Sequence, residues 1–445
     1  MIIVDETAQY LCDALRNGSK LTTLILNSEF EEYIVGNTGA KHLADALKTN
    51  TTLKILELRK NHIGAVGIEH LADALKNNSA LISLDLSENK IGDAEAKHIA
   101  DALKTNKTLT TLDLAWNKFK DAGAKHIADA LKVNKTLTTL DLSWCGIWDD
   151  GVQHLAEGLS RNSTLTYLKL EGCLTELMGM QKLSKVLRNN STLTTLFLPR
   201  ARFATVGIQD LADALTKNKT LTTLKFHSEG MENGGIEHLA DGLSHNSTLT
   251  TFDISYQKIG DYGVKHLANG LKLNSAIVIL NLEACKIGEC GAEYLAGILQ
   301  NNKTLITVNL FENEIGVAGA EHLSNVLRNN STLTTFNIGR NRIGDSGAKY
   351  IADALIYNNV ILITLTTLNM LGNEFGMIGI QHLANTLRIN KALITLNIRG
   401  NKTDAAGAQH IADALRYNKV ILVICSSLLY TSLLHIDTHQ VGLEL

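Results

Sequence analysis

Leucines recur along this chain at a spacing that dominates every other pattern. The stretch from Leu109 to Asn117 reads L-x-x-L-x-L-x-x-N, which predicts a short strand followed by a turn. Further along, Ala124 to Leu131 reads A-K-H-I-A-D-A-L, and its apolar residues fall at the spacing of one helix face. The strand pattern then starts again at Leu137, so the chain is predicted to repeat one strand–turn–helix unit.

The residue that opens each strand marks the period of this repeat. It occurs at Leu21, Leu53, Leu81, Leu109, Leu137, Leu165, Leu193, Leu221, Leu249, Ile277, Leu305, Leu333, Leu365 and Leu393. Most steps are 28 residues long, and the two steps that end at Leu53 and Leu365 are 32 residues long.

The two ends of the chain are less regular. A degenerate last copy is predicted to start at Cys425, with Leu428 and Tyr430 in frame. Residues 1–20 hold only part of a first repeat, as expected for a fragment of a longer protein. We predict a single solenoid over residues 1–445 with about 14–15 units, in which residues 417–445 form a degenerate C-terminal repeat or cap.

The pattern resembles the leucine-rich repeat family over residues 8–430, in the 28-residue subtype of ribonuclease inhibitor, NOD-like receptor repeats and Ran GTPase-activating protein. This resemblance implies an α/β solenoid, or horseshoe, with a parallel β-sheet on the concave face and α-helices on the convex face. The physics agrees, because strands stack about 4.8 Å apart while helices need about 8–10 Å. That mismatch is expected to turn the array by roughly 20–25° per repeat.

The apolar positions of each repeat predict its core. Strand positions 1, 4 and 6 are expected to point inward, as is the helix face that carries Ala40, Leu43, Ala44 and Leu47. Position 9 is predicted to satisfy buried turn backbone and is filled by Asn61, Asn89, Asn117, Asn313, Asn341, Asn373 and Asn401. Cys145, Cys173 and Cys285 occupy the same position, so we predict a structural role for them.

Composition and charge narrow the class of protein. The net charge of −3 lacks the basic field that general nucleic-acid binding needs. No signal peptide is evident, which favours a cytoplasmic location. Residues 420–434 are apolar, but fifteen residues fall short of the roughly 20 that span a membrane, so a last strand is favoured over a membrane anchor.

Two patterns look like chemistry but have a simpler interpretation. Histidines recur on the predicted helices, as at His42 with Asp45 one turn away, and we interpret them as a polar ladder on the outer face, not as metal ligands. Gly344-Asp345-Ser346-Gly347 resembles a serine-protease loop, but the same slot recurs in other repeats, so Asp345 is predicted to cap a helix. We therefore predict no metal, no cofactor and no enzyme activity.

The concave face carries the informative variation. Strand positions 3, 5, 7 and 8 are expected to point into the hollow, and position 3 is mostly threonine, which suits a solvated strand surface. Position 5 changes from acidic to basic or apolar and then to neutral: Asp85, Asp113, Asp141, Lys169, Phe197, Lys225, Asp253, Asn281, Asn309, Asn337, Asn369, Asn397. The early part of the hollow is therefore predicted to be acidic.

Aromatic residues gather beside this acidic run. Trp116 and Trp144 stand at position 8 and Tyr167 at position 3, while Trp148 follows in the next loop. Stacked like charges repel and exposed tryptophans leave apolar area in water, so neither feature is expected to help folding. Aromatic anchors ringed by charge are typical of binding hot spots. Duplication of near-identical repeats (113–116 and 141–144) would also place Asp and Trp together, without a binding role.

The sequence favours a non-catalytic protein-binding scaffold that uses its concave face. The predicted partner-binding residues are Asp85, Asp113, Trp116, Asp141, Trp144 and Tyr167, with Lys169 and Arg200 at the edge. The acidic run predicts another protein with a basic surface as the partner, not nucleic acid or a membrane. Two narrower alternatives are the sensor region of a NOD-like immune receptor and a GTPase-activating protein for a small GTPase. The long acidic tail that usually follows Ran GTPase-activating protein is missing, as are the cysteine-rich 28/29-residue units of ribonuclease inhibitor.

Overall fold

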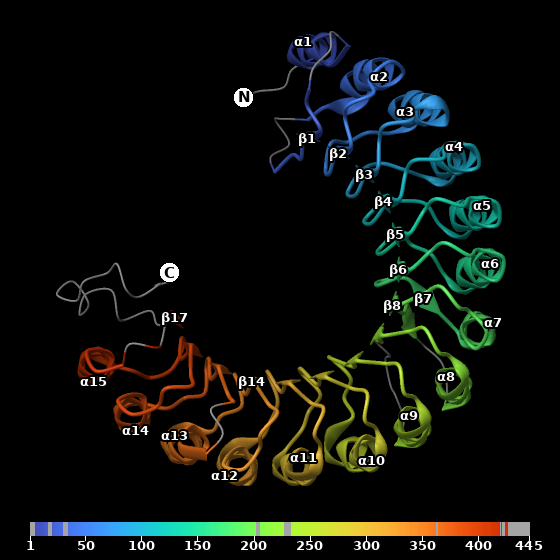
Figure 1. Cartoon of the computed structure of the whole chain (residues 1–445). Helices are drawn as coiled ribbons and strands as arrows, with labels where there is room; N and C mark the ends of the chain where they lie inside the picture. Colours follow the sequence, from blue (N-terminus) through green and yellow to red (C-terminus); the bar gives the residue numbers. More distant parts are fainter. Residues whose placement is uncertain are drawn as a thin grey trace. The chain divides into compact units, whose positions relative to one another are not determined.

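The computed structural model describes residues 5–16, 20–29, 34–201, 205–226, 233–361, 364–418, 420 and 423–425. The chain divides into two compact units, unit 1 (Met1–Glu229) and unit 2 (Gly230–Leu445). Within each unit, parallel strands line the inner side of a curved array and helices line its outer side (Figure 1). This is the leucine-rich-repeat solenoid architecture that the pattern predicts, while the single solenoid over the whole chain stays a prediction.

Unit 1 repeats strand and helix in alternation. Its strands are β1 (Thr23–Ile25), β2 (Ile55–Glu57), β3 (Ser83–Asp85), β4 (Thr111–Asp113), β5 (Thr139–Asp141), β6 (Tyr167–Lys169), β8 (Thr195–Phe197) and β10 (Thr223–Lys225). Its helices are α1 (Asp5–Arg16), α2 (Gly36–Leu47), α3 (Ala65–Asn77), α4 (Asp93–Leu103), α5 (Asp121–Leu131), α6 (Asp149–Leu159), α7 (Leu177–Leu187) and α8 (Thr205–Lys217). A small second sheet that the sequence does not predict pairs β7 (Leu174–Thr175) with β9 (Arg200–Ala201).

Unit 2 follows the same plan. Its strands are β11 (Thr251–Asp253), β12 (Ile279–Asn281), β13 (Thr307–Asn309), β14 (Thr335–Asn337), β15 (Thr367–Asn369), β16 (Thr395–Asn397) and β17 (Val423–Cys425). Its helices are α9 (Asn233–His245), α10 (Gly260–Leu273), α11 (Glu289–Asn301), α12 (Gly316–Leu327), α13 (Gly344–Ile361), α14 (Met377–Leu387) and α15 (Ala405–Leu415).

The leucines form the core as the pattern predicts. Leu109, Leu112 and Leu114 are fully buried, and so are the residues of the α2 face that carries Ala40 and Leu43. Each repeat buries these side chains against its neighbours, since a single short strand and one helix leave an apolar face uncovered. The core is therefore continuous along each unit.

Position 9 holds the turns together, which confirms the structural role predicted for it. The Asn89 Nδ2 donates to the carbonyl of Leu58 in the preceding repeat at 2.9 Å, and its Oδ1 accepts from the Ile63 N–H at 2.9 Å. The Cys145 Sγ lies 3.1 Å from the carbonyl of Leu114 in the preceding repeat, so Cys145 makes the same contact as Asn89. Burial raises the pKa of Cys173 to about 12, so that thiol stays protonated at neutral pH.

The helix caps differ from the sequence prediction in one respect. Asp345 does cap a helix, but it caps the next one, since its Oδ1 accepts from the N–H groups of Gly376 at 2.8 Å and Gly379 at 2.7 Å at the start of α14. Asp121 does the same for α6 through Trp148 and Gly151, at 2.7 and 3.1 Å. The glycine of each pair leaves room for the carboxylate, because a Cβ on Gly151 would meet it. These caps therefore join consecutive repeats.

Replacing Asp121 with alanine should destabilise unit 1 by about 1–2 kcal/mol, because the first N–H groups of α6 lose their acceptor. Asp121→Asn should cost less, since Asn37 already caps α3 in this way through Gly64 and Gly67. Urea unfolding followed by tryptophan fluorescence would measure the change. Asp150→Ala is the control, because Asp150 is an exposed carboxylate in the first turn of the same helix. Equal losses for Asp121→Ala and Asp150→Ala would contradict the proposed cap.

The last strand is also shifted from its predicted place. Leu396 of β16 pairs with Ile424, so Cys425 stands at position 5 of its repeat and not at position 1. The frame predicted from Cys425 was therefore wrong by four residues, because the apolar run before it hides where the strand begins. Leu428 and Tyr430 lie outside the described residues.

Candidate functional site

Carboxylates form a continuous row on the inner face of unit 1. The strand register places Asp113 directly between Asp85 on β3 and Asp141 on β5. Glu57 on β2 extends the row by one strand, because it pairs with Asp85. Glu57 was not among the predicted site residues, although it stands at position 5 of its repeat. We call Glu57, Asp85, Asp113 and Asp141 the carboxylate row.

The aspartates of this row also have a local structural role. The Oδ1 atoms of Asp85, Asp113 and Asp141 each accept a hydrogen bond at 2.8 Å from the backbone N–H two residues later. In unit 2 the amide of Asn309 accepts the same bond at 3.0 Å, and the asparagines at position 5 of the other repeats from β12 to β16 do likewise. A neutral asparagine therefore satisfies this turn, so the turn does not need the negative charges of unit 1.

The charge of Asp113 in this row is costly. Burial raises the pKa of Asp113 to about 7, and the neighbouring Asp141 and Asp85 act in the same direction, against the Ala115 N–H and Lys169. Among the described residues, no basic side chain lies within 4.0 Å of the carboxylates of Asp85 or Asp113. Asp113, in the middle of the row, is thus a half-buried acid without an ion-pair partner among the described residues, although it and Asp85 help to raise the pKa of the nearby Arg59.

Two tryptophans form a ridge beside the row. The Trp116 and Trp144 rings stack with their centroids 4.8 Å apart and their planes 12° apart, and they are 55% and 46% exposed. Trp144 also covers Gly172, where a Cβ would clash with the indole. The prediction that these side chains are exposed is confirmed, but they also stabilise each other, which the sequence analysis did not foresee.

The turn that carries this ridge has an unusual backbone. Trp116 and Trp144 have φ of 57° and 58°, the left-handed region that favours glycine. Glycine fills the same slot at Gly172, Gly372 and Gly400, with φ between 64° and 70°. The turn therefore accepts residues without a side chain, and its backbone geometry gives no reason for tryptophan.

Lysines and aromatic rings close one end of the row. The Lys169 ammonium lies 3.4 Å from Asp141 and 3.3 Å from Glu171, and Lys225 lies 2.8 Å from Glu171. Burial by itself would lower the pKa of Lys169, but Asp141 and Glu171 outweigh it and raise that pKa. The ring of Tyr167 meets Phe197 edge to face, with centroids 5.7 Å apart. Charge at this end is therefore paired, unlike in the middle of the row.

The structure brings together most of the predicted site residues. Arg200 is the exception, because it lies on β9 beyond the main sheet of unit 1, and its place in the site stays a prediction. The prediction that position 7 faces the hollow is wrong for Ser87, Ala115 and Ser143, which are buried. Arg59 and Arg399 stand at the same position and are exposed. Glu171 is a larger residue at that position and pairs with both lysines, which the alternation of the strand could not reveal.

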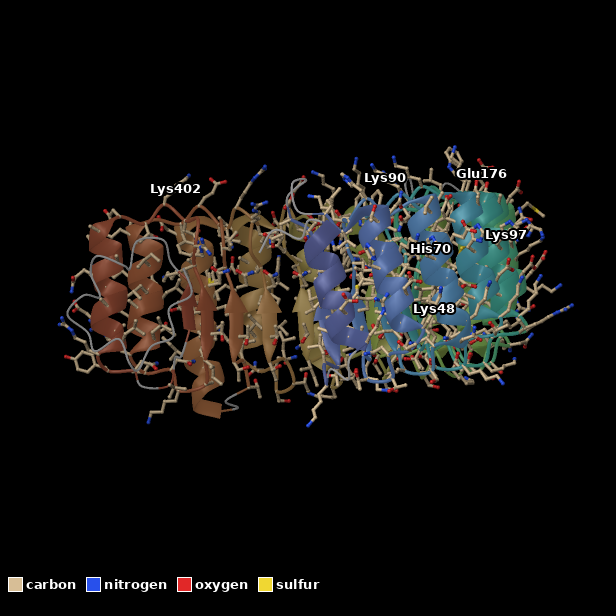
Figure 2. The ribbon with its side chains drawn as sticks, turned by 90° about the horizontal axis from the view of Figure 1, so that it is seen from above. Lys48, His70, Lys90, Lys97, Glu176 and Lys402 are labelled. Carbon is tan, nitrogen blue, oxygen red and sulfur yellow. The ribbon has the colours of Figure 1, made fainter. Side chains whose placement is uncertain are left out.

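The outer face of unit 1 is a surface of ion pairs. Figure 2 shows Lys48, His70 and Lys97 on the outward side of the helical layer. Asp45 pairs with Lys48 at 3.1 Å, and Asp101 lies between Lys104 and Lys97. Those two lysines lower the pKa of Asp101 to about 2. The polar ladder is present, but lysines and not histidines are the partners of the helix aspartates shown here.

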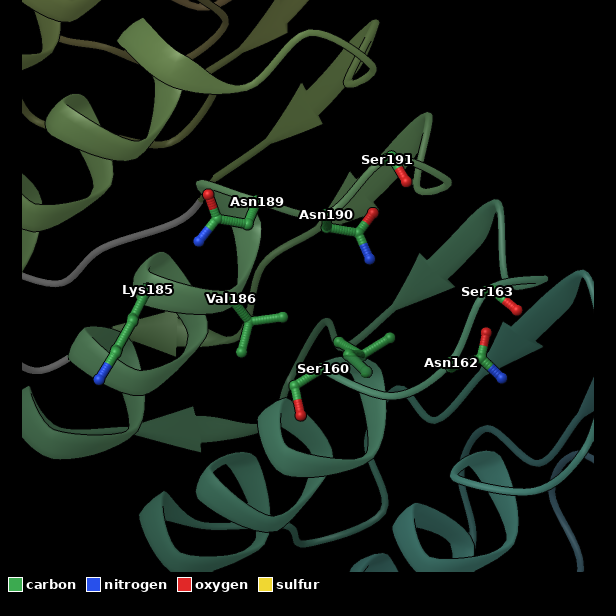
Figure 3. Close-up of a pocket in the computed structure, with 9 residues that line it drawn as sticks. Ser160, Asn162, Ser163, Lys185, Val186, Asn189, Asn190 and Ser191 are labelled. Atoms are coloured by element: carbon green, nitrogen blue, oxygen red, sulfur yellow. The ribbon is translucent and has the colours of Figure 1, made fainter.

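A shallow pocket of about 380 Å³ lies in unit 1 where α6 leads into β6 and α7 leads into β8 (Figure 3). Its lining consists of Leu159, Ser160, Asn162, Ser163, Lys185, Val186, Asn189, Asn190 and Ser191. Lys185 is the one charged side chain among these lining residues. The described residues hold no group of three or more histidine, cysteine, aspartate or glutamate side chains placed to bind a metal ion.

Comparison with known proteins identifies the repeats. Seven segments match the leucine-rich repeat family model: residues 49–72, 77–99, 105–128, 133–156, 245–268, 301–324 and 329–352. Together with the fold, these matches show that the chain contains leucine-rich repeats. The ribonuclease-inhibitor-like subtype stays a prediction. No curated protein matches the chain by sequence.

Several solved structures are similar to the chain at low TM-scores. The chain in a complex of Rad7 and Elc1 from yeast is 16% identical, with 91% of this chain and 90% of that chain covered and a TM-score of 0.41. An internalin from Listeria monocytogenes is 17% identical, with 92% and 87% covered and a TM-score of 0.40. Leiomodin-1 actin-binding site 2 is 22% identical over 40% of this chain and 86% of that chain, with a TM-score of 0.27. At this distance they bring no function to the chain.

No helix in the part of the chain that the structure describes has the length and apolar composition to cross a membrane. Most of residues 420–434, the apolar stretch near the C-terminal end, lie outside that part.

Proposed function

We propose that this chain is a non-catalytic protein-binding scaffold and that the inner face of unit 1 binds a protein with a basic surface. The observation that carries this proposal is the row of carboxylates at positions where asparagine satisfies the same turn. Solenoids of this kind commonly bind partners on their extended inner surface. Carboxylates at these positions lower folding stability, although asparagine would satisfy the turn without a charge. Such a cost is expected where function needs the negative charge.

The tryptophan ridge supports the same surface. Trp116 and Trp144 are half-exposed side chains in a slot that glycine fills elsewhere, and they adjoin the acids. Large aromatic side chains next to charged groups are enriched among the residues that dominate binding energy. The described residues offer nothing that favours the NOD-like receptor or GTPase-activating alternatives, so we do not propose either.

A capture experiment with a matched control tests the location of the site. The intact chain and an Asp113→Lys, Trp144→Ala variant would be used to capture proteins from lysate, with bound proteins identified by mass spectrometry. Asp253→Lys, Tyr256→Ala is the control, because 253–256 (D-I-S-Y) repeats 141–144 (D-L-S-W) at the same two positions of a unit 2 repeat. A protein lost only with the first variant supports the proposal, and a protein held equally by both variants contradicts it.

The association rate of a partner identified in this way should fall as salt rises. Charge steering raises association rates by roughly 10–10³-fold at low ionic strength, and the Debye length shrinks from about 30 Å at 0.01 M to about 3 Å at 1 M salt. Stopped-flow or surface measurements from 20 to 500 mM NaCl would measure the slope. An association rate that stays constant across this range would exclude steering by the carboxylate row.

A further inference from the structure

The inner surface of unit 1 from β3 to β5 carries a floor of short side chains beside the carboxylate row, and on β2 the larger, exposed Ile55 takes the same place. This floor consists of the short position 3 side chains Ser83, Thr111 and Thr139, which are half-buried. The carboxylate row runs alongside this floor, two residues further along each strand, and the tryptophan ridge stands beyond the row. Tyr167 replaces the small side chain of the floor on β6 and closes that end. We call this surface the acidic trough.

The width of the acidic trough suits one element of secondary structure. The strands shown here span three residues, as in Thr111–Asp113, which is about 10 Å. An α-helix with its side chains is about 10–12 Å across. A single helix lying across the strands would therefore cover the floor and the row together, with one side against the tryptophan ridge.

The spacing of the acids distinguishes a helix from an extended chain. Neighbouring strands are about 4.8 Å apart, so Glu57 and Asp141 are separated by about 14 Å along the row. Side chains at i, i+4, i+7 and i+11 of a helix cover about 16 Å on one face. Four alternate residues of an extended strand cover about 20 Å. A helix can thus offer one cation to each carboxylate, whereas an extended chain runs out of register.

We propose, on the basis of the function proposed above, that the acidic trough binds an α-helix of the partner with arginine or lysine at i, i+4, i+7 and i+11. The cations of this helix contact Glu57, Asp85, Asp113 and Asp141, the last of which is shared with Lys169, and its apolar flank lies against Trp116 and Trp144. Charge complementarity decides the class of occupant, because the unpaired acids in the middle of the row would repel a polyanion or an acidic helix.

Three synthetic peptides with the same number of arginines test this inference. The first is an alanine-rich helix with four arginines at i, i+4, i+7 and i+11, stapled on the opposite face. The second is the same stapled helix with the arginines distributed around the axis. The third carries the first sequence without a staple and with two D-amino acids that prevent helix formation. Fluorescence anisotropy at 50 mM NaCl would give Kd for each peptide and the intact chain.

The first peptide should bind at least about tenfold more tightly than the other two, since only it presents four cations to one row. Asp85→Asn, Asp113→Asn should weaken its binding by a similar factor, while Asp253→Asn should not. Equal binding of all three peptides, with the same dependence on the carboxylates, contradicts the proposal that the partner segment is a helix. It still agrees with a partner that has a basic surface. Failure of all three to bind also overturns the helix, and the capture experiment then decides the proposed function separately.

Discussion

Replacing Asp113 with asparagine should make unit 1 more stable at pH 8 and weaken its binding to a basic partner by about 10- to 100-fold. The amide keeps the hydrogen bond to the Ala115 N–H, as Asn309 does with Phe311. It removes a half-buried charge that lies between Asp85 and Asp141. Stability and function are thus expected to change in opposite directions, which a purely structural role for Asp113 would not produce.

The stability gain should depend on pH. Because the pKa of Asp113 is raised to about 7 in the folded chain, from about 3.9 in an unfolded chain, the folded state holds the proton more tightly. The contribution of this group to stability is fully present below about pH 4 and is lost as pH rises through about 7. Asp113→Asn should therefore gain on the order of 2 kcal/mol at pH 8 and little at pH 4.

Urea unfolding followed by tryptophan fluorescence would measure this gain, because the three tryptophans, at 116, 144 and 148, all report on unit 1. Asp253→Asn is the matched control, since Asp253 makes the same turn bond to Ser255 at 2.9 Å but pairs with Asn281 on β12. Partner affinity should rise between pH 6 and pH 8 for the intact chain and stay flat for Asp113→Asn. A stability gain that is equal at pH 4 and pH 8 would refute the electrostatic explanation.

Replacing Trp116 and Trp144 with glycine should abolish most of the binding without destabilising unit 1. The two substitutions lose a ring stack of about 0.5–1.5 kcal/mol. They also relieve a left-handed backbone that costs about 1–2 kcal/mol for each non-glycine residue. Each tryptophan that anchors a partner is expected to contribute about 2 kcal/mol or more to binding, which is roughly 30-fold in Kd.

Binding of the Trp116→Gly, Trp144→Gly variant would be measured by calorimetry, with circular dichroism to compare thermal unfolding. Tyr256→Gly is the control, because Tyr256 fills the same slot of unit 2 with φ of 62° and is also half-exposed. Unchanged affinity of the double variant would favour the other interpretation, in which duplication of near-identical repeats placed Asp and Trp together without a binding role.

Much of this architecture is predictable from the sequence because the information is local. Alternation within a strand places Leu112 inside and Asp113 outside whatever the neighbouring repeats do. Errors arose where the local pattern weakens. Apolar residues continue through 420–424 and hide the start of β17, and the chain turns after position 6, which buries Ala115 although alternation predicts exposure.

The site was predicted less completely, because its chemistry depends on contacts between repeats. The sequence identified the acids and the tryptophans, but the ion pairs of Lys169 with Asp141 and Glu171 depend on how β5 and β6 pack. The raised pKa of Asp113 depends on burial and on the two strands beside it. Neither these ion pairs nor this pKa can be predicted from the sequence of a single repeat.

The sequence by itself determined the repeat, the residues of its core and the acidic character of one stretch of inner face, because periodicity assigns each residue to a side of its own strand or helix. Only the tertiary structure decided which repeat each polar group serves. Asp345 caps the helix of the following repeat, Asn89 binds the carbonyl of the preceding one, and Trp144 stacks on Trp116. These partners lie close to one full repeat away in the sequence, so they become neighbours only when the repeats stack.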